Sequence, residues 1–494
     1  MTPGARLLRG AATTEVFALL LACALLFAWI GTVPGLHGDE AWNILTAYHI
    51  AAGTMRPFTG MTSYSGALYD YLLVPVLAWG DWSTPALRAF AATCNLAALG
   101  FAFAALRHAE PSVPARRWTA LLLATSPIYV VLSRYAVEVT ALTPLFSAIA
   151  LWLLCGASTS RRLFLAGLAF GIAGYNHALA LALPLALAAI ALLFDRKSWL
   201  TARVLVPLAC GFALGFAPRI VAAFFVPMQM RPQIAPPAED LLYLPWAFFR
   251  TVDGSLLYRW VTGQQWLWVI PYAALALVGI AILRHAQGAP WQRRDAALAA
   301  LVFGLAVAMA LISPSLAPRY FLLPGLLFAV LLARLAAPLF DGRYARAAHA
   351  VLGATLALNL AYLAVDYFAT FRNTGGGLAE VRIGKRSLES SHEFVPSDAL
   401  YRQLVDRGIE QVICDRFIGW PLAVHDLAGQ RLLITIAELQ GPTVQRARAA
   451  VVAYAARTTR PQLNVQDAQI VDAGGVNLYR DRSFDHRFAV FVTR

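Results

Sequence analysis

Charged residues are scarce in this chain. They make up 14% of its 494 residues, whereas a soluble domain carries about 25%. Hydrophobic residues account for 59%, so the composition excludes an ordinary soluble enzyme and a disordered chain. Five cysteines are too few for a disulfide scaffold. Four of them lie in apolar runs, and Cys414 has no partner in its own region.

Lysine is nearly absent, since it occurs only at Lys197 and Lys385, and the net charge of +13 therefore comes from arginine. No basic run is interleaved with aromatic residues, which argues against a nucleic-acid partner. Before the last 125 residues, most arginines lie in short loops between apolar runs. That pattern is typical of loops that set the orientation of a membrane protein. The Arg- and Ala-rich composition also indicates a GC-rich bacterium.

Long apolar runs dominate the first 370 residues. A helix needs about 20 apolar residues to cross a membrane, and we predict eleven spans, at residues 16–34, 86–106, 118–133, 137–156, 162–177, 178–194, 203–226, 266–283, 296–313, 319–338 and 347–369. The weaker run 67–80 is short and polar at both ends. Counting it as a span would place most later arginine loops outside, so we expect a juxtamembrane or re-entrant helix there. We expect a broken hairpin where runs five and six meet, at Tyr175–His177.

The loop charges also predict the topology. With the N-terminus inside, the inner loops carry twice as many basic residues as the outer segments. The first run is expected to stay as an uncleaved helix, because its small residues lie within the run. We therefore predict a bacterial inner-membrane protein with a transmembrane domain over 1–370, whose outer loops are 34–85 and 227–265, and a periplasmic domain over 371–494.

The C-terminal region reads as a small α/β domain after the glycine linker 375–377. Gly408 is a fitting residue to follow the end of its first helix. The expected elements are a helix over 397–407, a strand over 410–414, a helix over 418–428 and a strand over 431–436.

The segment His37–Asn43 is the most informative stretch, because it places Asp39 and Glu40 directly after the first span. Two carboxylates at a membrane surface carry a desolvation cost that needs a reason. An apolar stripe predicts an amphipathic helix over 41–53 that lies on the membrane. The spacing leaves two interpretations of Asp39 open: it caps this helix, or it does chemistry.

An Asp-Glu pair after the first span, followed by an interfacial helix ending in glycine, resembles the GT-C membrane glycosyltransferases. The closer likeness is to the branch of protein O-mannosyltransferases and lipid A aminoarabinose transferases. The likeness covers roughly residues 15–370. It is carried further by Tyr69–Leu73, Trp79–Asp81, Ala86–Phe90, Ala124–Pro127, Ser133–Ala136, Gly167–Ala169 and Pro318–Pro324.

The chain departs from this family at three places. Members often have a lysine where this chain has His177, and many have an aspartate where it has Glu138. The expected paired prolines are replaced by Ser65–Ala67. These departures bear on the donor sugar and the phosphate contacts more than on the fold.

The resemblance implies an inverting glycosyltransferase that uses a polyprenyl-phosphate sugar as donor. Its acceptor is an envelope glycolipid such as lipopolysaccharide, another glycan or a protein, and the transferred sugar is a hexose or pentose. Asp39 is the candidate general base. Candidates for binding the donor phosphate are Arg319, Arg134 and Arg88, with Tyr320 as a hydrogen-bond donor. The alternative is that these arginines extend to lipid headgroups.

Other polar residues have open roles. Glu40 either orients Asp39, binds a metal or favours a helix N-terminus. Glu138 either pairs with Arg134 at the i,i+4 spacing or belongs to a second acidic motif, and Asp70 is a further candidate. His177 and His37 are structural, or they contact phosphate or metal. Some GT-C enzymes use a divalent cation, but no metal-ligand spacing occurs here.

Two other functions remain as alternatives. A secondary transporter or a flippase of lipid-linked sugars would favour mid-span charges and internal repeats, and the chain shows few such charges and no repeat. A polymerase or ligase of lipid-linked glycans would need an outer loop with Arg and His, and 227–265 has no His.

Overall fold

The computed structural model describes most of the first 370 residues and part of the C-terminal region. The described residues are 3–62, 64–156, 159–199, 201–225, 238–254, 271–312, 318–369, 372, 382–383, 386–387, 394–395, 397–414, 416–427, 431–436, 449–454, 470–472, 477–481 and 488–492. The predicted linker at 375–377 and most of the predicted outer loop 227–265 lie outside them.

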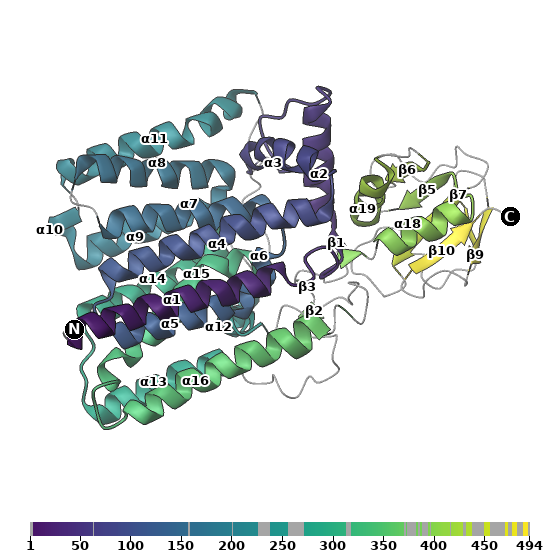
Figure 1. Cartoon of the computed structure of the whole chain (residues 1–494). Helices are drawn as coiled ribbons and strands as arrows, with labels where there is room; N and C mark the ends of the chain where they lie inside the picture. The colour runs from purple at the N-terminus through teal and green to yellow at the C-terminus, as the bar shows by residue number, and fades with distance from the viewer. Residues whose placement is uncertain are drawn as a thin grey trace.

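Long helices lie side by side in a bundle, with the N-terminus at one end and the C-terminal region beyond the other (Figure 1). We name these the inner end and the outer end. The bundle helices are α1 (Pro3–Phe27), α4 (Thr84–Ala109), α5 (Val113–Thr125), α6 (Pro127–Ser133), α7 (Glu138–Cys155), α8 (Ser160–Asn176), α9 (Ala182–Phe194), α10 (Arg196–Trp199), α11 (Ala202–Phe225), α12 (Ala238–Val252), α13 (Tyr272–Gln287), α14 (Arg293–Ile312), α15 (Leu322–Ala336) and α16 (Ala345–Ala361).

Among the described residues, six helical segments are long and apolar enough to cross a membrane, by length and composition. They comprise α4, α7, α11, α14, α15 with its flanking turns, and α16 with the π-helix η5 (Tyr362–Ala369). Shorter apolar helices include α13, α9 and the second half of α1. The count of eleven spans stays a prediction. The run 118–133 is divided between α5 and α6, because Pro127 has no N–H group and disfavours helix at the residue before it.

Glycines allow α8 and α11 to pack closely. A Cβ atom on Gly167 would collide with the carbonyl oxygen of Leu208, and one on Gly211 would collide with that of Phe164. This small-residue packing is a common way for membrane helices to associate. At the outer end of α8 the chain turns at His177 into the 3-10 turn η1 (Ala178–Leu181) and then α9, which gives the expected broken hairpin.

Two short helices cover the outer end: α2 (Gly38–Ala51) and α3 (Leu68–Trp79). Helix α2 covers most of the segment 41–53 that we expect to form an amphipathic helix. It packs against α3 on one side and the C-terminal region on the other, with Ala41, Ile44 and Ala47 in a shared apolar cluster. Its N-cap is His37, so Asp39 lies inside the first turn.

The described part of the C-terminal region contains the helices α18 and α19 beside a six-stranded sheet. The helices are α18 (Ser397–Asp406) and α19 (Arg416–Asp426). The sheet order is β6-β5-β7-β10-β9-β8, with β5 parallel to β6 and β7 and the other pairs antiparallel. The strands are β5 (Gln411–Cys414), β6 (Leu433–Ile436), β7 (Ala449–Tyr454), β8 (Ile470–Asp472), β9 (Asn477–Asp481) and β10 (Phe488–Val492). Gly408 has a φ of +67°, which suits glycine after a helix end. The domain boundary at 370/371 stays a prediction.

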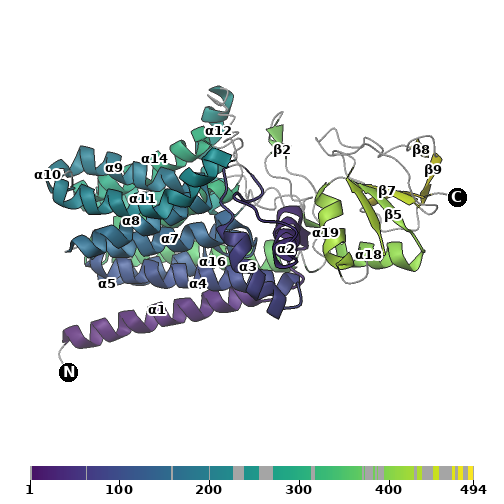
Figure 2. The ribbon, with the colours of Figure 1, turned by 90° about the horizontal axis from the view of Figure 1, so that it is seen from above.

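The C-terminal region contacts the outer end of the bundle at α2 (Figure 2). Strand β1 (Leu36–His37) pairs antiparallel with β4 (Phe394–Val395). Trp420 and Val424 of α19 pack against the apolar cluster of α2 and α3. A separate two-stranded ladder joins β2 (Arg382–Ile383) to β3 (Arg386–Ser387). The segment that holds Asp39 is therefore fixed from both sides.

Candidate functional site

The first turn of α2 is fixed by a reciprocal cap. His37 Nδ1 accepts the backbone N–H of Asp39 at 2.9 Å. The backbone N–H of His37 donates to Glu40 Oε2 at 3.0 Å. His37 thus has a capping role, and this arrangement satisfies two N–H groups that a helix start leaves open. The two carboxylates point in different directions: Glu40 toward Arg88 inside the bundle, and Asp39 toward Tyr135.

Glu40 is bound inside the bundle by Arg88. Arg88 Nε and Nη2 donate to its two oxygens at 2.8 and 2.7 Å, and both side chains are fully buried. The backbone N–H of Ala136 adds a contact at 3.1 Å. Burial alone would raise the pKa of Glu40, but the Arg88 charge and these hydrogen bonds lower it below the ordinary value. Glu40 is therefore a fixed carboxylate whose partners are already protein groups.

Arg88 and Arg134 support the backbone around the site. Besides Glu40, Arg88 donates to the carbonyl oxygens of Pro34 at 2.7 Å and Gly35 at 2.8 Å. Arg134 donates to Leu26 at 2.6 Å and to other carbonyl oxygens near the end of α1, and to the Tyr367 hydroxyl at 3.2 Å. Both arginines are buried, with their guanidinium groups turned to the protein.

Of the two interpretations of Glu138, the i,i+4 pair with Arg134 is not formed. The Arg134 guanidinium donates to carbonyl oxygens that α1 leaves open at its C-terminal end, because a helix has no internal donors for its last carbonyls. Arg134 precedes α7, whereas Glu138 is the first residue of that helix. The two residues therefore do not share one helical face, which the i,i+4 contact requires.

Asp39, unlike Glu40, keeps one carboxylate oxygen available. Its Oδ2 accepts the hydroxyl of Tyr135 at 2.6 Å and lies 3.6 Å from Arg319 Nη1. Arg319 Nη1 also donates to the Tyr135 hydroxyl at 3.2 Å, so the three side chains form one cluster. Across the described part of the chain, Asp39 Oδ1 has no hydrogen-bond partner, although the side chain is only 11% exposed. An oxygen of this kind is able to accept a proton from a bound molecule.

Tyr135 is a site residue that sequence reasoning missed. Its hydroxyl links Asp39, Arg319 and His37, the last at 3.1 Å from Nδ1. The signal available was its place in Ser133–Ala136, a segment that carries the family resemblance. Nothing in the spacing distinguishes Tyr135 from a tyrosine of the membrane interface, because its partners are at least 96 residues away in the chain.

Two further carboxylates lie near Asp39. Glu138 begins α7 and is within electrostatic range of both Asp39 and Arg319. Asp70 in the first turn of α3 is buried and lies within range of Glu138. Among the described residues neither forms an ion pair with a basic side chain. The same residues include no group of three His, Cys, Asp or Glu arranged to hold a metal ion.

His177 and Tyr320 extend the cluster away from Asp39. The His177 ring lies between the rings of Tyr64 and Tyr320, at centroid distances of 5.3 and 6.4 Å. Its Nδ1 accepts the N–H of Leu179 and so starts the turn η1.

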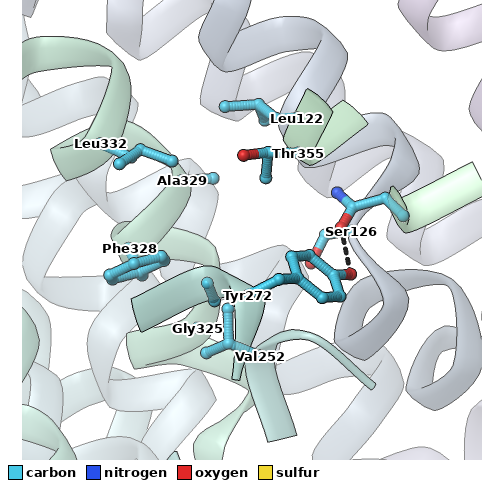
Figure 3. A pocket seen from close by; sticks show the side chains of 11 residues that line it. Leu122, Ser126, Val252, Tyr272, Gly325, Phe328, Ala329, Leu332 and Thr355 are labelled. Atoms are coloured by element: carbon cyan, nitrogen blue, oxygen red, sulfur yellow. Dashed lines mark hydrogen bonds between the residues drawn. The ribbon is translucent and has the colours of Figure 1, made fainter. Parts of the chain in front are cut away.

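A separate small pocket lies deeper in the bundle (Figure 3). It is lined mainly by apolar side chains of α5, α12, α13 and α15, with Tyr272 donating to Asn359 at 2.6 Å on one wall. Its volume of 20 Å³ is enough for about one water molecule. It contains no Asp, Glu, Arg or His side chain, so we assign the chemistry to the Asp39 cluster instead.

No protein-family model matches the chain, and no curated protein matches it in sequence. Solved structures do match. ArnT from Cupriavidus metallidurans in the apo state is 14% identical, with 98% of each chain covered and a TM-score of 0.60. The same ArnT bound to undecaprenyl phosphate is 14% identical, with 97% of each chain covered and a TM-score of 0.57.

A third match is weaker: the mycobacterial arabinofuranosyltransferase AftD is 15% identical over 82% of this chain and 29% of its own. Its TM-score of 0.37 carries no argument. The likeness to ArnT shows the fold: this chain folds like ArnT over nearly its whole length.

Proposed function

We propose that this protein is a membrane glycosyltransferase that moves a sugar from a polyprenyl-phosphate donor to an acceptor hydroxyl at the outer end of the bundle. The observation that carries the proposal is Asp39, a nearly buried carboxylate with one available oxygen beside Arg319 and Tyr135. The ArnT fold supports the reaction class, and the undecaprenyl phosphate bound to ArnT supports the type of donor lipid.

The proposed reaction is a single displacement. The acceptor oxygen forms a bond to C1 of the sugar while Asp39 takes the hydroxyl proton. The bond between C1 and the phosphate oxygen breaks, and polyprenyl phosphate leaves with the electron pair. One displacement inverts the configuration at C1. Tyr135 donates to Asp39 and so holds its carboxylate in one orientation.

Arg319 is our candidate for neutralising the departing phosphate. Its side chain is 20% exposed, and its guanidinium reaches Asp39 and lies over the Tyr320 ring. Arg88 and Arg134, the other arginines expected at the phosphate, use their guanidinium groups to bind Glu40 and backbone carbonyls. They position the segment that carries Asp39.

We infer an orientation with the inner end in the cytoplasm and the C-terminal region in the periplasm of a bacterial inner membrane. Arginine-rich loops at the inner end support this orientation. We propose that the transmembrane domain ends at 370 and that the region 371–494, whose helix α19 packs against the cluster of α2 and α3, receives the acceptor. The sugar and the acceptor, whether lipopolysaccharide, another glycan or a protein, are left to experiment.

The test is sugar transfer by the purified full-length protein in nanodiscs. A panel of undecaprenyl-phosphate sugars, labelled in the sugar, is offered with envelope lipid extract as acceptor. We expect label to move from the donor and Asp39→Asn to lower the rate about 100- to 10,000-fold, the usual contribution of a general base. Asp398→Asn is the matched control, since Asp398 is an exposed carboxylate of α18 paired only with Arg402.

Full transfer by a folded Asp39→Asn protein would contradict the assignment of Asp39. Absence of transfer from every donor, with the protein folded, would favour the transporter or flippase alternative. The next experiment would then measure the flux of lipid-linked sugars across the membrane of proteoliposomes.

A further inference from the structure

The strand that leads into α2 is paired with the C-terminal region. In the antiparallel ladder of β1 and β4, Leu36 lies opposite Val395 and His37 lies opposite Phe394. Asp39 is the first carboxylate after this ladder, two residues beyond the end of β1. A ladder of two residue pairs is weak by itself, because isolated two-stranded ladders are only marginally stable in water. It therefore depends on support from neighbouring elements.

Helix α19 supplies this support through apolar side chains. Trp420 and Val424 pack against the cluster of α2 and α3. The same cluster contains Leu36 of β1 and Ala41 of α2, both of which are buried. Figure 2 shows α19 beside α2 at the outer end of the bundle. Backbone pairing and apolar packing therefore fix the same short segment, residues 36–41, to the C-terminal region.

His37 connects this ladder to Asp39. Its Nδ1 accepts the backbone N–H of Asp39 at 2.9 Å and lies 3.1 Å from the Tyr135 hydroxyl. The His37 and Tyr135 rings meet edge to face, with centroids 4.5 Å apart. The Tyr135 hydroxyl in turn donates to Asp39 Oδ2 at 2.6 Å. His37 thus contacts β4 on one side, and on the other it contacts both groups that orient Asp39.

The position of Asp39 matters for the chemistry. A general base takes a proton only within hydrogen-bond reach, and a displacement of about 1 Å can lower a rate about 100-fold. The backbone of Asp39 is held by His37, and its carboxylate is held by Tyr135, which His37 also contacts. Separation of β1 from β4 would therefore loosen both contacts. Binding of an acceptor does not by itself require such a ladder.

We propose that the C-terminal region positions the general base. Strand β4 and helix α19 fix the segment 36–41, and His37 is the positioning residue that connects this contact to Asp39. The inference rests on the proposed transferase function and goes beyond a role of the region 371–494 in receiving the acceptor. It predicts that this region affects kcat even when the acceptor is saturating.

The first test measures amide hydrogen exchange of the full-length protein in nanodiscs, without substrate. Phe394→Pro disrupts β4, because proline has no N–H group and a fixed φ. We expect the amides of residues 36–41 to exchange about 10-fold faster in this variant, the effect of roughly one lost hydrogen bond. Ser387→Pro is the matched control, since β3 pairs only with β2 in the described ladder. Unchanged exchange in Phe394→Pro overturns the proposal.

The second test separates kcat from KM for sugar transfer. We expect His37→Ala to lower kcat about 10- to 100-fold, as for a displaced base, with little change in KM for donor or acceptor. His37→Asn should recover part of this loss, because asparagine also accepts an N–H group at a helix start. Phe394→Pro should lower kcat in the same way. A higher KM for the acceptor with an unchanged kcat overturns the proposal, because the region then only binds the acceptor.

A reversible cross-link tests the same contact in a protein whose ladder stays intact. Antiparallel partners have Cα atoms about 4.5–5.5 Å apart, within the range of a disulfide, so Leu36→Cys with Val395→Cys joins β1 to β4. We expect the oxidised protein to keep the kcat of the reduced one, because the ladder stays closed during transfer. Loss of transfer on oxidation, restored by a reductant and absent in Leu36→Cys alone, overturns the proposal.

Failure of this inference and failure of the proposed function are distinguishable. If the wild type transfers sugar and Phe394→Pro shows faster exchange with an unchanged kcat, only the positioning role is overturned. If the folded wild type transfers no sugar from any donor, the proposed function fails, and the positioning of a general base fails with it. Hydrogen exchange still reports whether β4 fixes the segment 36–41 in that case.

Discussion

Two buried clusters of arginine and carboxylate lie at opposite ends of the same bundle, and they are built differently. At the inner end, Arg334 donates to Glu110 at 3.0 Å and to Asp295 at 3.0 Å, and Arg284 donates to Asp295 at 2.5 Å. Two cations meet two carboxylates, and the network joins the α4–α5 loop, α13, α14 and α15.

The outer cluster lacks this balance. Glu40 and Arg88 form a closed pair. Asp70 and Glu138 have no basic partner among the described residues, and Arg219 has no acidic one. Buried charges that are paired are compatible with a structural role, whereas unpaired ones are costly and tend to mark sites. The contrast favours the outer end as the place of ligand binding.

The largest effect on stability should come from removing Arg88, the buried partner of Glu40. Arg88→Met leaves Glu40 buried without its cation, so we expect a loss of about 3–5 kcal/mol in unfolding free energy. Thermal unfolding in detergent measures it. The double variant Glu40→Gln/Arg88→Met should recover part of the loss, because no unpaired charge remains. No loss in Arg88→Met would contradict the pairing.

The inner network predicts a stability effect without a catalytic one. Asp295→Asn removes the carboxylate shared by Arg284 and Arg334, and we expect a loss of about 2–4 kcal/mol. The folded fraction should transfer sugar at the wild-type rate per molecule. A lower kcat of Asp295→Asn, measured on folded protein, would contradict a purely structural role of the inner network.

Tyr135→Phe should have a smaller effect, and on activity alone. The variant loses the hydrogen bond from the Tyr135 hydroxyl to Asp39, which is worth about 0.5–1.5 kcal/mol, or roughly 2- to 10-fold in kcat. Tyr71→Phe is the matched control, since the hydroxyl of Tyr71 donates to a backbone carbonyl of Pro57 at the exposed surface. Equal effects of the two variants would argue against Tyr135 as a positioning residue.

The smallest effect is a pH dependence of stability. Because the pKa of Glu40 is lower in the folded protein than its ordinary value of 4.5, the pair with Arg88 stabilises the fold above that value. Its contribution is lost as the pH falls below it. The Tm difference between wild type and Glu40→Gln, measured from pH 7 to pH 4, should shrink on acidification. A constant difference would contradict the lowered pKa.

The backbone elements were more predictable than the side-chain partners. The helix over 67–80 and the hairpin broken at His177 follow from local apolar patterns, and the structure contains both as α3 and as α8 with α9. The role of His37 as a cap was missed, because histidine is not among the favoured cap residues. The packing of α2 against α19 was also missed, since it depends on contacts between segments that are distant in the sequence.

The candidate site was likewise predictable only in part. The Asp39–Glu40 pair stands out in the sequence, because adjacent carboxylates after an apolar run are rare at a membrane surface. The sequence alone could not tell which arginine faces outward: Arg88, Arg134 and Arg319 all lie at span edges. Their partners lie 48 to 233 residues away, so only packing decides which guanidinium is buried.

By itself, then, the sequence determined the membrane location, the order of the helices and the acidic pair, since hydrophobicity and periodicity are local properties. Only the tertiary structure decided that Glu40 is enclosed with Arg88 while Asp39 keeps one available oxygen, that Tyr135 joins the site, and that Arg219 has no acidic partner among the described residues. Those properties depend on distances and burial between segments that the sequence does not place together.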